Sequence, residues 1–124
     1  MTTGFSLIDL PSFGDERGWL SVVDGNLPFE TKRIYWIYGA DGQVRGGHRH
    51  KVTRQALIAV SGIVDVFMDD GVKQETVRLS HPRQCLLVEP QDWHQMTFGS
   101  GAVLLVLASH PFDPNDYIEQ RYEK

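Results

Sequence analysis

The chain has 124 residues with a nearly average composition, 41% hydrophobic and 23% charged, and its 12 Lys and Arg against 16 Asp and Glu give a net charge of −4. This length predicts one domain spanning 1–124, with a core large enough to fold without disulfides or a structural metal. The composition excludes collagenous, disordered and coiled-coil classes. The negative net charge argues against a nucleic-acid partner.

Cysteine usage and hydropathy narrow the class further. The single cysteine excludes an internal disulfide framework and a multi-cysteine zinc site. Cys85 precedes the apolar run 86–88, so we expect a small buried core residue. No apolar run approaches the ~20 residues that span a bilayer, and the N-terminal segment lacks the apolar centre of a signal peptide. We therefore expect a cytoplasmic protein without a membrane partner.

In chain order, short strands alternate with turn signals. The predicted strands are 33–38, 55–60, 63–68, 74–79, 85–88 and 102–108. The pair Asp70-Gly71 indicates a hairpin between 63–68 and 74–79, because glycine accepts a positive φ. Strands spaced about 8–12 residues apart with Gly, Pro and Asp turns predict an antiparallel sandwich or barrel. Only the C-terminal segment, from Asn115 as cap to Arg121, is expected to form a short helix.

The segment 42–51 is the most informative one, because two histidines follow a pair of glycines. In a strand, alternate residues share a face, so His48 and His50 point the same way and Arg49 points to the other side. Two neutral imidazoles close together can bind a metal or move protons as acid and base. The competing interpretation is a basic surface stretch shared with Arg45 and Lys51.

The wider spacing Gly42, His48-x-His50, Gln55, Gly62 resembles the first signature motif of the cupin superfamily, with Gln55 in place of the family's Glu. The segment 90–94 resembles the second motif less closely. The resemblance implies a small antiparallel jelly-roll barrel, often dimeric, with a site in its mouth. Metallocupins hold their ion with two His, a carboxylate and a third His, so the neutral Gln55 favours a metal-free acid–base site, whereas His94 would be the third ligand in a metal-dependent one.

Segments along nearly the whole chain resemble a narrower family. They are Asp15-Glu16-Arg17-Gly18, 27–29, 32–37, 45–51, Gln55, 69–71, 88–94, 106–109 and 116–118. They are similar to the dTDP-4-keto-6-deoxyglucose 3,4-ketoisomerases, WxcM-like sugar isomerases of bacterial surface-glycan (O-antigen) and antibiotic pathways. The resemblance implies conversion of a dTDP-linked 4-keto-6-deoxyhexose into its 3-keto isomer through an enediol, without a cofactor. Arg49 departs from the Ala that the family usually has there.

The resemblance also implies roles for individual residues. His50 is the expected base at C3 and His48 the proton shuttle, or the reverse. Tyr35 or Tyr38 is expected to polarise the carbonyl or to hydrogen-bond a sugar oxygen. The binding candidates are Arg45 for the enediolate or a phosphate, Arg17 and Lys51 for the diphosphate, Gln55 beside the histidines, and Trp93 or Trp36 for stacking on thymine.

Product configuration and assembly follow from the same resemblance. Arg17 together with His94 resembles the branch that makes the galacto product, and a homodimer with an exchanged first strand is implied. Three alternatives stay open. They are a metal-dependent cupin oxygenase that uses His48, His50, Gln55 and His94, a non-catalytic sugar-binding cupin, and an epimerase with a His base and a Tyr acid.

Overall fold

A computed structural model describes residues 4–123, and these residues form twelve strands and one 3₁₀ turn. The strands are β1 (Leu7–Asp9), β2 (Ser12–Asp15), β3 (Gly18–Ser21), β4 (Arg33–Ile37), β5 (Val44–His50), β6 (Gln55–Ser61), β7 (Val64–Asp69), β8 (Gln74–Leu79), β9 (Gln84–Val88), β10 (Trp93–Phe98), β11 (Val103–Ala108) and β12 (Tyr117–Ile118), and the 3₁₀ turn is η1 (Pro114–Asp116).

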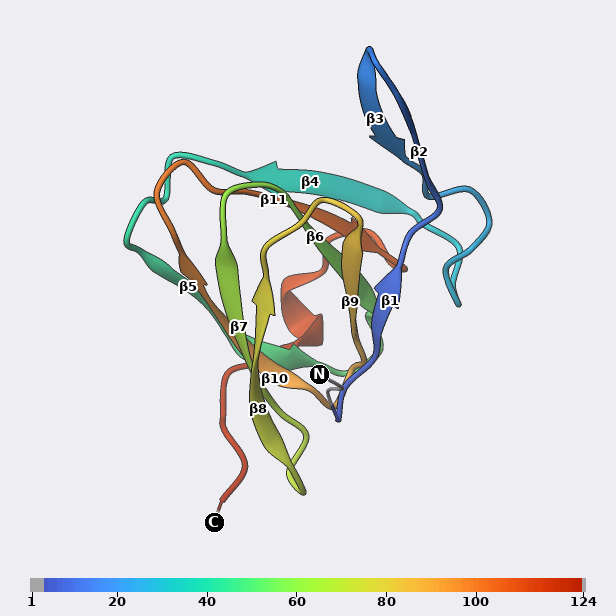
Figure 1. Cartoon of the computed structure of the whole chain (residues 1–124). Helices are drawn as coiled ribbons and strands as arrows, with labels where there is room; N and C mark the ends of the chain where they lie inside the picture. Colours follow the sequence, from blue (N-terminus) through green and yellow to red (C-terminus); the bar gives the residue numbers. More distant parts are fainter. Residues whose placement is uncertain (1–3, 124) are drawn as a thin grey trace.

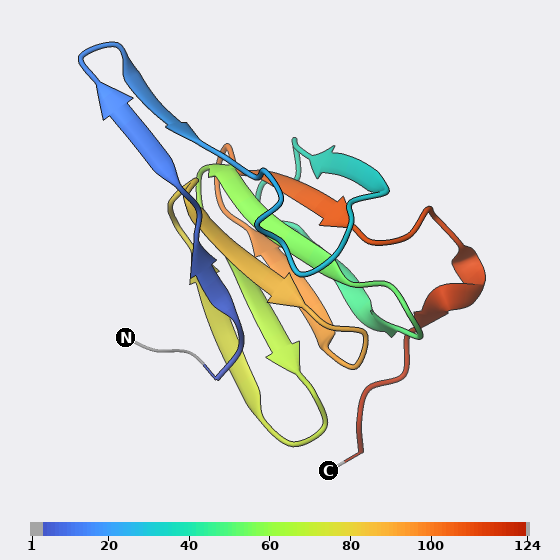
Figure 2. The ribbon, with the colours of Figure 1, turned by 90° about the vertical axis from the view of Figure 1, so that its right-hand side faces the viewer.

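The strands form two five-stranded antiparallel sheets. The first sheet has the order β1-β9-β6-β11-β4 and the second the order β12-β5-β10-β7-β8. They enclose a barrel-like interior, whereas the β2–β3 hairpin projects away from both sheets (Figures 1 and 2). The predicted all-β jelly-roll architecture is therefore confirmed. Each sheet joins strands distant in sequence, such as β5 with β10 and β6 with β11, so the segments 44–50 and 93–98 become neighbours.

The core between the sheets follows from apolar alternation along the strands. In β7, Val64, Val66 and Met68 point inward and are fully buried, and they meet Leu104 and Val106 of β11 within one cluster. A second cluster covers the outer face of the first sheet, where side chains of the loop 22–29 pack on it. Cys85 belongs to this outer cluster and has no exposed surface, which confirms its expected core role.

All six predicted strands are present, with no end shifted by more than one residue. The hairpin at Asp70-Gly71 is confirmed, since Gly71 has a φ of 90° between β7 and β8. The expected C-terminal helix is only the three-residue η1, capped by Asp113 instead of Asn115, and the chain then continues as strand β12. The strand β10 was not predicted. Within residues 4–123, no helix has the length and apolarity needed to cross a bilayer.

Candidate active site

The histidine-bearing strand β5 is shaped by two glycines. Gly46 and Gly47 have φ values of 88° and 82°, a region that other residues rarely enter. Along β10, His94 pairs with His48 and Gln95 pairs with Gly46, so that Gly47 is an extra residue in a bulge. A Cβ at position 46 would lie 3.1 Å from the backbone oxygen of His94. The glycines therefore allow the close approach of β5 and β10 beside the histidines.

Three imidazoles gather where β5 and β10 meet. The ring centroids of His48 and His50 lie 4.9 Å apart, and those of His48 and His94 lie 5.0 Å apart. His50 and His94 are 5.9 Å apart, and both side chains are buried. His48 and His50 thus share a face, as strand alternation predicts, and β10 adds His94 to the same group.

All three imidazoles have a lowered pKa and are neutral at pH 7. Burial lowers the pKa of His94 to about 3, and its Nδ1 lies 3.0 Å from the carbonyl oxygen of Asp92, which can only accept a hydrogen bond. Burial, together with repulsion from His48, lowers the pKa of His50 to about 4. Burial also lowers the pKa of His48, although a hydrogen bond with the backbone of Gly46 opposes this shift.

The imidazole of His50 has unused hydrogen-bonding capacity. Neither Nδ1 nor Nε2 of its ring has a hydrogen-bond partner, although both atoms are buried. A buried polar group without a partner costs about 1–3 kcal/mol, and native proteins rarely leave one so. The ring nitrogens of His50 are therefore free for an incoming hydroxyl or carbonyl group.

Tyr35 of β4 presents a phenol from the first sheet. Gln55 Nε2 donates a hydrogen bond of 3.2 Å to the phenol oxygen, so the proton of that phenol stays available to another acceptor. Burial raises the pKa of Tyr35, with a further contribution from Tyr117. The positive charges of Arg33 and Arg45 oppose this shift, and the Arg33 guanidinium lies 4.4 Å from the centroid of the Tyr35 ring. Tyr35 is therefore a protonated donor at neutral pH.

Sequence reasoning missed two residues of the group, Asp116 and Tyr117. The Tyr117 ring lies 4.5 Å from the His48 ring and 4.8 Å from the His50 ring, centroid to centroid. Asp116 is buried and receives hydrogen bonds from the turn after β5. Both residues lie in the segment 116–118, which resembled the ketoisomerases but was interpreted as part of a helix. The β propensity of the pair Tyr117-Ile118 was the signal that pointed to a strand.

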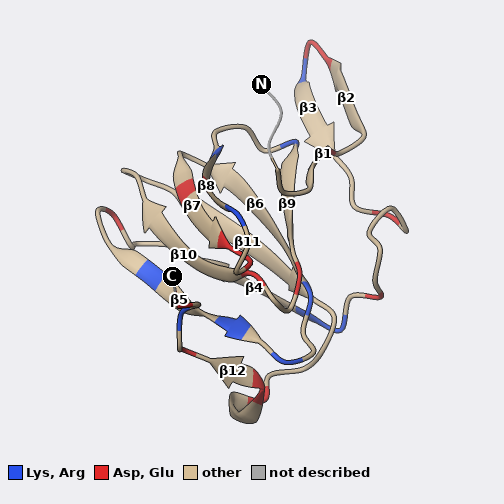
Figure 3. Ribbon diagram, turned by 90° about the horizontal axis from the view of Figure 1, so that it is seen from below, with Lys and Arg blue, Asp and Glu red and all other residues tan. Residues whose placement is uncertain are grey.

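Several candidates lie elsewhere in this chain. Trp93 alternates with His94 along β10 and packs against Phe67 and the C-terminal segment. Trp36 is 59% exposed on the face of β4 opposite Tyr35, and Tyr38, which directly follows β4, is 71% exposed. The Lys51 side chain is exposed beyond the end of β5. Basic and acidic residues are interspersed over the molecule (Figure 3).

Arg17 lies at the tip of the projecting β2–β3 hairpin. Its guanidinium pairs with Asp15 at 2.6 Å, and its side chain is 84% exposed. Within one chain the hairpin stands away from both sheets, so Arg17 is not brought to the histidines (Figure 1).

The donor set does not fit the metal centre of a metallocupin. Among residues 4–123, no three His, Cys, Asp or Glu side chains converge in a way that could hold a metal ion. Position 55 contributes a neutral amide whose nitrogen donates to Tyr35. The site therefore lacks the carboxylate that the metallocupin donor set has beside its imidazoles.

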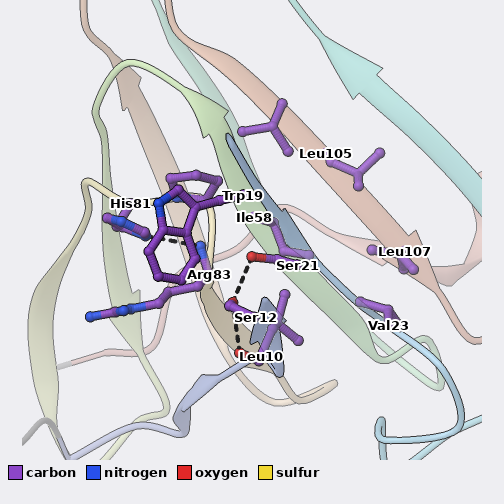
Figure 4. A pocket seen from close by; sticks show the side chains of 12 residues that line it. Leu10, Ser12, Trp19, Ser21, Val23, Ile58, His81, Arg83, Leu105 and Leu107 are labelled. Carbon is purple, nitrogen blue, oxygen red and sulfur yellow. Dashed lines mark hydrogen bonds between the residues drawn. The ribbon is translucent and has the colours of Figure 1, made fainter. Parts of the chain in front are cut away.

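A large pocket lies on the outer face of the first sheet. Its volume is about 640 Å³, and it is lined by apolar side chains such as Ile58, Leu105 and Leu107, with Trp19 of the hairpin above them (Figure 4). Ser12 and Ser21 hydrogen-bond each other across the hairpin base at its edge. The pocket exists because the hairpin stands off the sheet, and none of the three histidines lines it.

Comparisons with known proteins agree with this chemistry. The family model described as FdtA: WxcM-like, C-terminal matches residues 3–124. The TDP-4-oxo-6-deoxy-alpha-D-glucose-3,4-oxoisomerase of Aneurinibacillus thermoaerophilus is 38% identical over 118 residues, which cover 92% of this chain and 85% of that protein. The WlaRB TDP-quinovose 3,4-ketoisomerase of Campylobacter jejuni is similar in structure, with a TM-score of 0.89 and 36% identity over 96% of this chain and 95% of that one.

The QdtA 3,4-ketoisomerase of Thermoanaerobacterium thermosaccharolyticum is similar to the same extent. A double variant with Arg for Tyr and His for Arg, in complex with TDP, has a TM-score of 0.89 and 36% identity over 97% of this chain and 90% of that one. A His-to-Asn variant is in complex with TDP-4-keto-6-deoxyglucose, with a TM-score of 0.89 and 33% identity over the same shares of the two chains.

Proposed function

The chain belongs to the FdtA family of WxcM-like, C-terminal domains, and from this premise we propose that it is a 3,4-ketoisomerase of a TDP-linked 4-keto-6-deoxyhexose. It moves a ketone from C4 to C3 of the sugar and is therefore an intramolecular oxidoreductase. The named relative with 38% identity acts on TDP-4-oxo-6-deoxyglucose, which is the substrate we expect here.

The observation that carries this proposal is the group of neutral imidazoles beside a protonated phenol. Isomerisation needs one group to take the C3 proton and to return a proton to C4, and another to move the O3 proton to O4, all at neutral pH. His48, His50 and Tyr35 supply these groups, and both ring nitrogens of His50 are unpartnered. The reaction transfers no electron to an outside acceptor, because C4 is reduced as C3 is oxidised.

The hydrogen bond of His48 and the lower pKa of His50 support His48 as base and His50 as shuttle, which is the second of the two assignments that the sequence leaves open. A base is more effective when its conjugate acid is stable, and the hydrogen bond with Gly46 supports protonation of His48. His50, with a pKa of about 4 and two free nitrogens, is a weaker base. It is suited to accept the O3 proton and to return a proton to O4.

Tyr35 and Arg45 complete the proposed chemistry. The Tyr35 hydroxyl donates to the substrate carbonyl, because Gln55 occupies its oxygen and leaves the proton free. Arg45, whose positive charge lowers the pKa of this phenol, stabilises the negative charge of the enediolate or of a phosphate. Lys51, exposed past β5, remains a candidate for the diphosphate.

The product is proposed to have the galacto configuration at C4. Arg17 and His94 are the residues to which this preference is assigned. His94 holds its Nδ1 proton on the Asp92 carbonyl and has a pKa of about 3, so Nε2 is a hydrogen-bond acceptor instead of a proton donor. We expect His94 to orient a hydroxyl group of the sugar. We expect Arg17 to supply the positive charge at the site.

Arg17 reaches a site only if two chains associate. We therefore propose a homodimer in which the β2–β3 hairpin of one subunit lies on its partner, with 1–124 acting as one domain in each. Exposed apolar side chains on the hairpin and on β4 support this proposal, since water disfavours such surface. We also propose a cytoplasmic location for the enzyme.

The test is turnover of TDP-4-keto-6-deoxyglucose by the purified protein, followed by NMR of the sugar. We expect a 3-keto product with an axial C4 hydroxyl, and we expect the chelator EDTA to leave the rate unchanged. His48→Asn should lower kcat by about a thousandfold while TDP affinity stays within about threefold. Failure of the wild-type protein to form any 3-keto sugar would overturn the proposed function.

A further inference from the structure

The C-terminal segment enters the second sheet beside the two catalytic histidines. After η1 the chain forms β12, in which Tyr117 pairs with His50 and Ile118 pairs with Arg49. β12 is only two residues long, so its place on the edge of β5 depends on contacts besides the ladder. Those contacts come from Asp116 and from the ring of Tyr117.

Asp116 fixes the start of β12 to the turn that follows β5. Its Oδ1 accepts hydrogen bonds from the backbone N–H groups of Lys51, at 3.1 Å, and Val52, at 2.8 Å. Its Oδ2 accepts from the hydroxyl of Thr53, and its carbonyl accepts from Lys51 N–H as well. Burial alone would raise the pKa of this carboxyl, but the hydrogen bonds from Thr53 and Val52 outweigh it and lower the pKa.

The hydrogen bonds of Asp116 hold the neighbouring Tyr117 against both imidazoles. The Tyr117 ring is tilted by 52° against the His48 ring and by 68° against the His50 ring, at 4.5 and 4.8 Å. The two imidazoles are nearly perpendicular to each other, at 82°. Phe112 lies 5.9 Å from the Tyr117 ring, so the phenol ring itself is held between aromatic neighbours.

We propose that Tyr117 is a positioning residue, whose ring fixes the relative orientation of His48 and His50. Without this ring both imidazoles lose a packing partner, and neither ring nitrogen of His50 has a hydrogen bond that would hold the imidazole in place. Packing is thus what fixes the direction of its nitrogens. Displacing a reacting group by about 1 Å can lower the rate about a hundredfold, so this orientation matters for turnover. The inference rests on the proposed isomerase activity of the two histidines.

In this proposal the ring of Tyr117, and not its hydroxyl, orients the imidazoles. Three variants separate this role from a role of the hydroxyl and from a loss of strand stability. Tyr117→Phe keeps the ring, Tyr117→Ala removes it, and Ile118→Ala removes packing from the opposite face of the same short strand. We expect Tyr117→Ala to lower kcat at least about tenfold, with KM and TDP affinity within about threefold of wild type. Tyr117→Phe and Ile118→Ala should retain kcat within about threefold.

Two results from these rates would overturn the inference. One is an unchanged kcat in Tyr117→Ala. The other is an equal loss of kcat in one of the two control variants. An equal loss in Ile118→Ala would point to the stability of the strand, and an equal loss in Tyr117→Phe would point to the hydroxyl. If Tyr117→Ala does not fold, Tyr117→Leu fills part of the space without a flat ring and takes its place, with the same expected loss.

A crystal structure of the Tyr117→Ala protein with TDP tests the inference without turnover. We expect one or both imidazoles to leave the perpendicular arrangement that they have at 4.9 Å in the wild-type protein. Identical imidazole orientations in the variant would contradict positioning by Tyr117. An inactive wild-type protein would overturn the proposed function instead, so the two failures are distinguishable.

Discussion

The three imidazoles, of which His50 and His94 are buried and His48 is half-buried, determine how the activity responds to pH. Burial is the first cause of the lowered pKa of His48, His50 and His94, which is about 4 for His50 and about 3 for His94. A base must be unprotonated, so the acid limb of kcat/KM should be centred below pH 6.5. A pH–rate profile measures this. An acid limb centred at or above the ordinary histidine pKa of 6.5 would contradict it.

Stability should depend on pH through the same residues. An unfolded histidine has a pKa near 6.5, above the folded values, so the unfolded chain takes up more protons as pH falls. The stability that these groups contribute is therefore present above pH 6.5 and lost toward pH 4. Thermal unfolding should show a Tm that decreases over this window. As a control, His81→Asn removes an exposed histidine that has no part in the site and should leave that decrease unchanged.

Gln55 offers a sharper test of Tyr35. In Gln55→Glu, the introduced carboxylate accepts the phenol proton that the amide now leaves free, so Tyr35 no longer donates to the substrate. We expect kcat to fall by about a hundredfold. If the effect passes through Tyr35, the Gln55→Glu/Tyr35→Phe protein should be no slower than Tyr35→Phe alone. Additive losses in that double-mutant cycle would show that Gln55 acts independently of Tyr35.

Among single residues, the sequence identified those close to the His-x-His motif and missed those that a distant segment supplies. His48, His50 and Gln55 lie within eight positions, and the strand period alone places the two histidines on one face. Asp116 and Tyr117 lie 66 and 67 positions after His50 in the chain, and only the sheet register brings Tyr117 beside His50. Local periodicity has no information on such a pairing.

Among the elements, those with clear alternation were predicted well. In β7, Val64, Val66 and Met68 occupy every second position, in β8 Val77 and Leu79 do so at its second half, and a Gly turn lies between the two strands. β10 was missed because Trp93, Gln95 and Thr97 alternate with His94, Met96 and Phe98, so that an aromatic stands on each face. β12 was interpreted as helix because Asn115 and Asp116 are residues typical of helix N-caps, whereas here they close a 3₁₀ turn.

Arg49, the departure from the family's usual Ala, has a structural partner. Its guanidinium lies 4.3 Å from the centroid of the Tyr122 ring, and its Nε donates to the carbonyl of Gln120 at 3.3 Å. Trp93 Nε1 donates to the carbonyl of Glu119, which fixes the same C-terminal segment one residue before Gln120. Arg49 therefore points away from the histidines, as alternation predicted, and holds the C-terminal tail against the outer face of the second sheet.

Arg49→Ala should loosen this tail while the histidines keep their neighbours. We expect faster amide hydrogen exchange in residues 119–122 and a kcat within about threefold of wild type. The matched control is Arg78→Ala, which removes an exposed guanidinium paired with Asp65 on β7 and leaves the tail untouched. Exchange that is equally slow in the Arg49→Ala protein would contradict the role of this residue.

At the scale of the whole molecule, several exposed apolar side chains lie on the projecting β2–β3 hairpin and on the edge strand β4. Phe13, Trp19 and Leu20 of the hairpin are 63%, 77% and 57% exposed, and Trp36 on the edge strand β4 is 59% exposed. An open sheet edge next to exposed apolar side chains favours pairing with another chain. We expect sedimentation to give twice the 14.1 kDa of one chain. Trp19→Asp should shift the protein toward monomer, whereas Val72→Asp, on the exposed hairpin between β7 and β8, should not.

The hairpin also predicts where Arg17 acts, and mixed dimers can test it. One chain carries Arg17→Tyr and keeps its histidines, and the other carries His48→Asn and keeps Arg17, so only the first chain has a working site. If Arg17 reaches its own site, the product of the mixed dimer matches that of the Arg17→Tyr homodimer, with a changed ratio of C4 configurations. If the hairpin crosses to the partner, the working site receives Arg17 from the His48→Asn chain and makes the galacto product. Because Arg17 lies at the tip of a hairpin that stands away from both sheets of its own chain, we expect the second result, measured by NMR of the sugar formed by co-expressed, differently tagged chains.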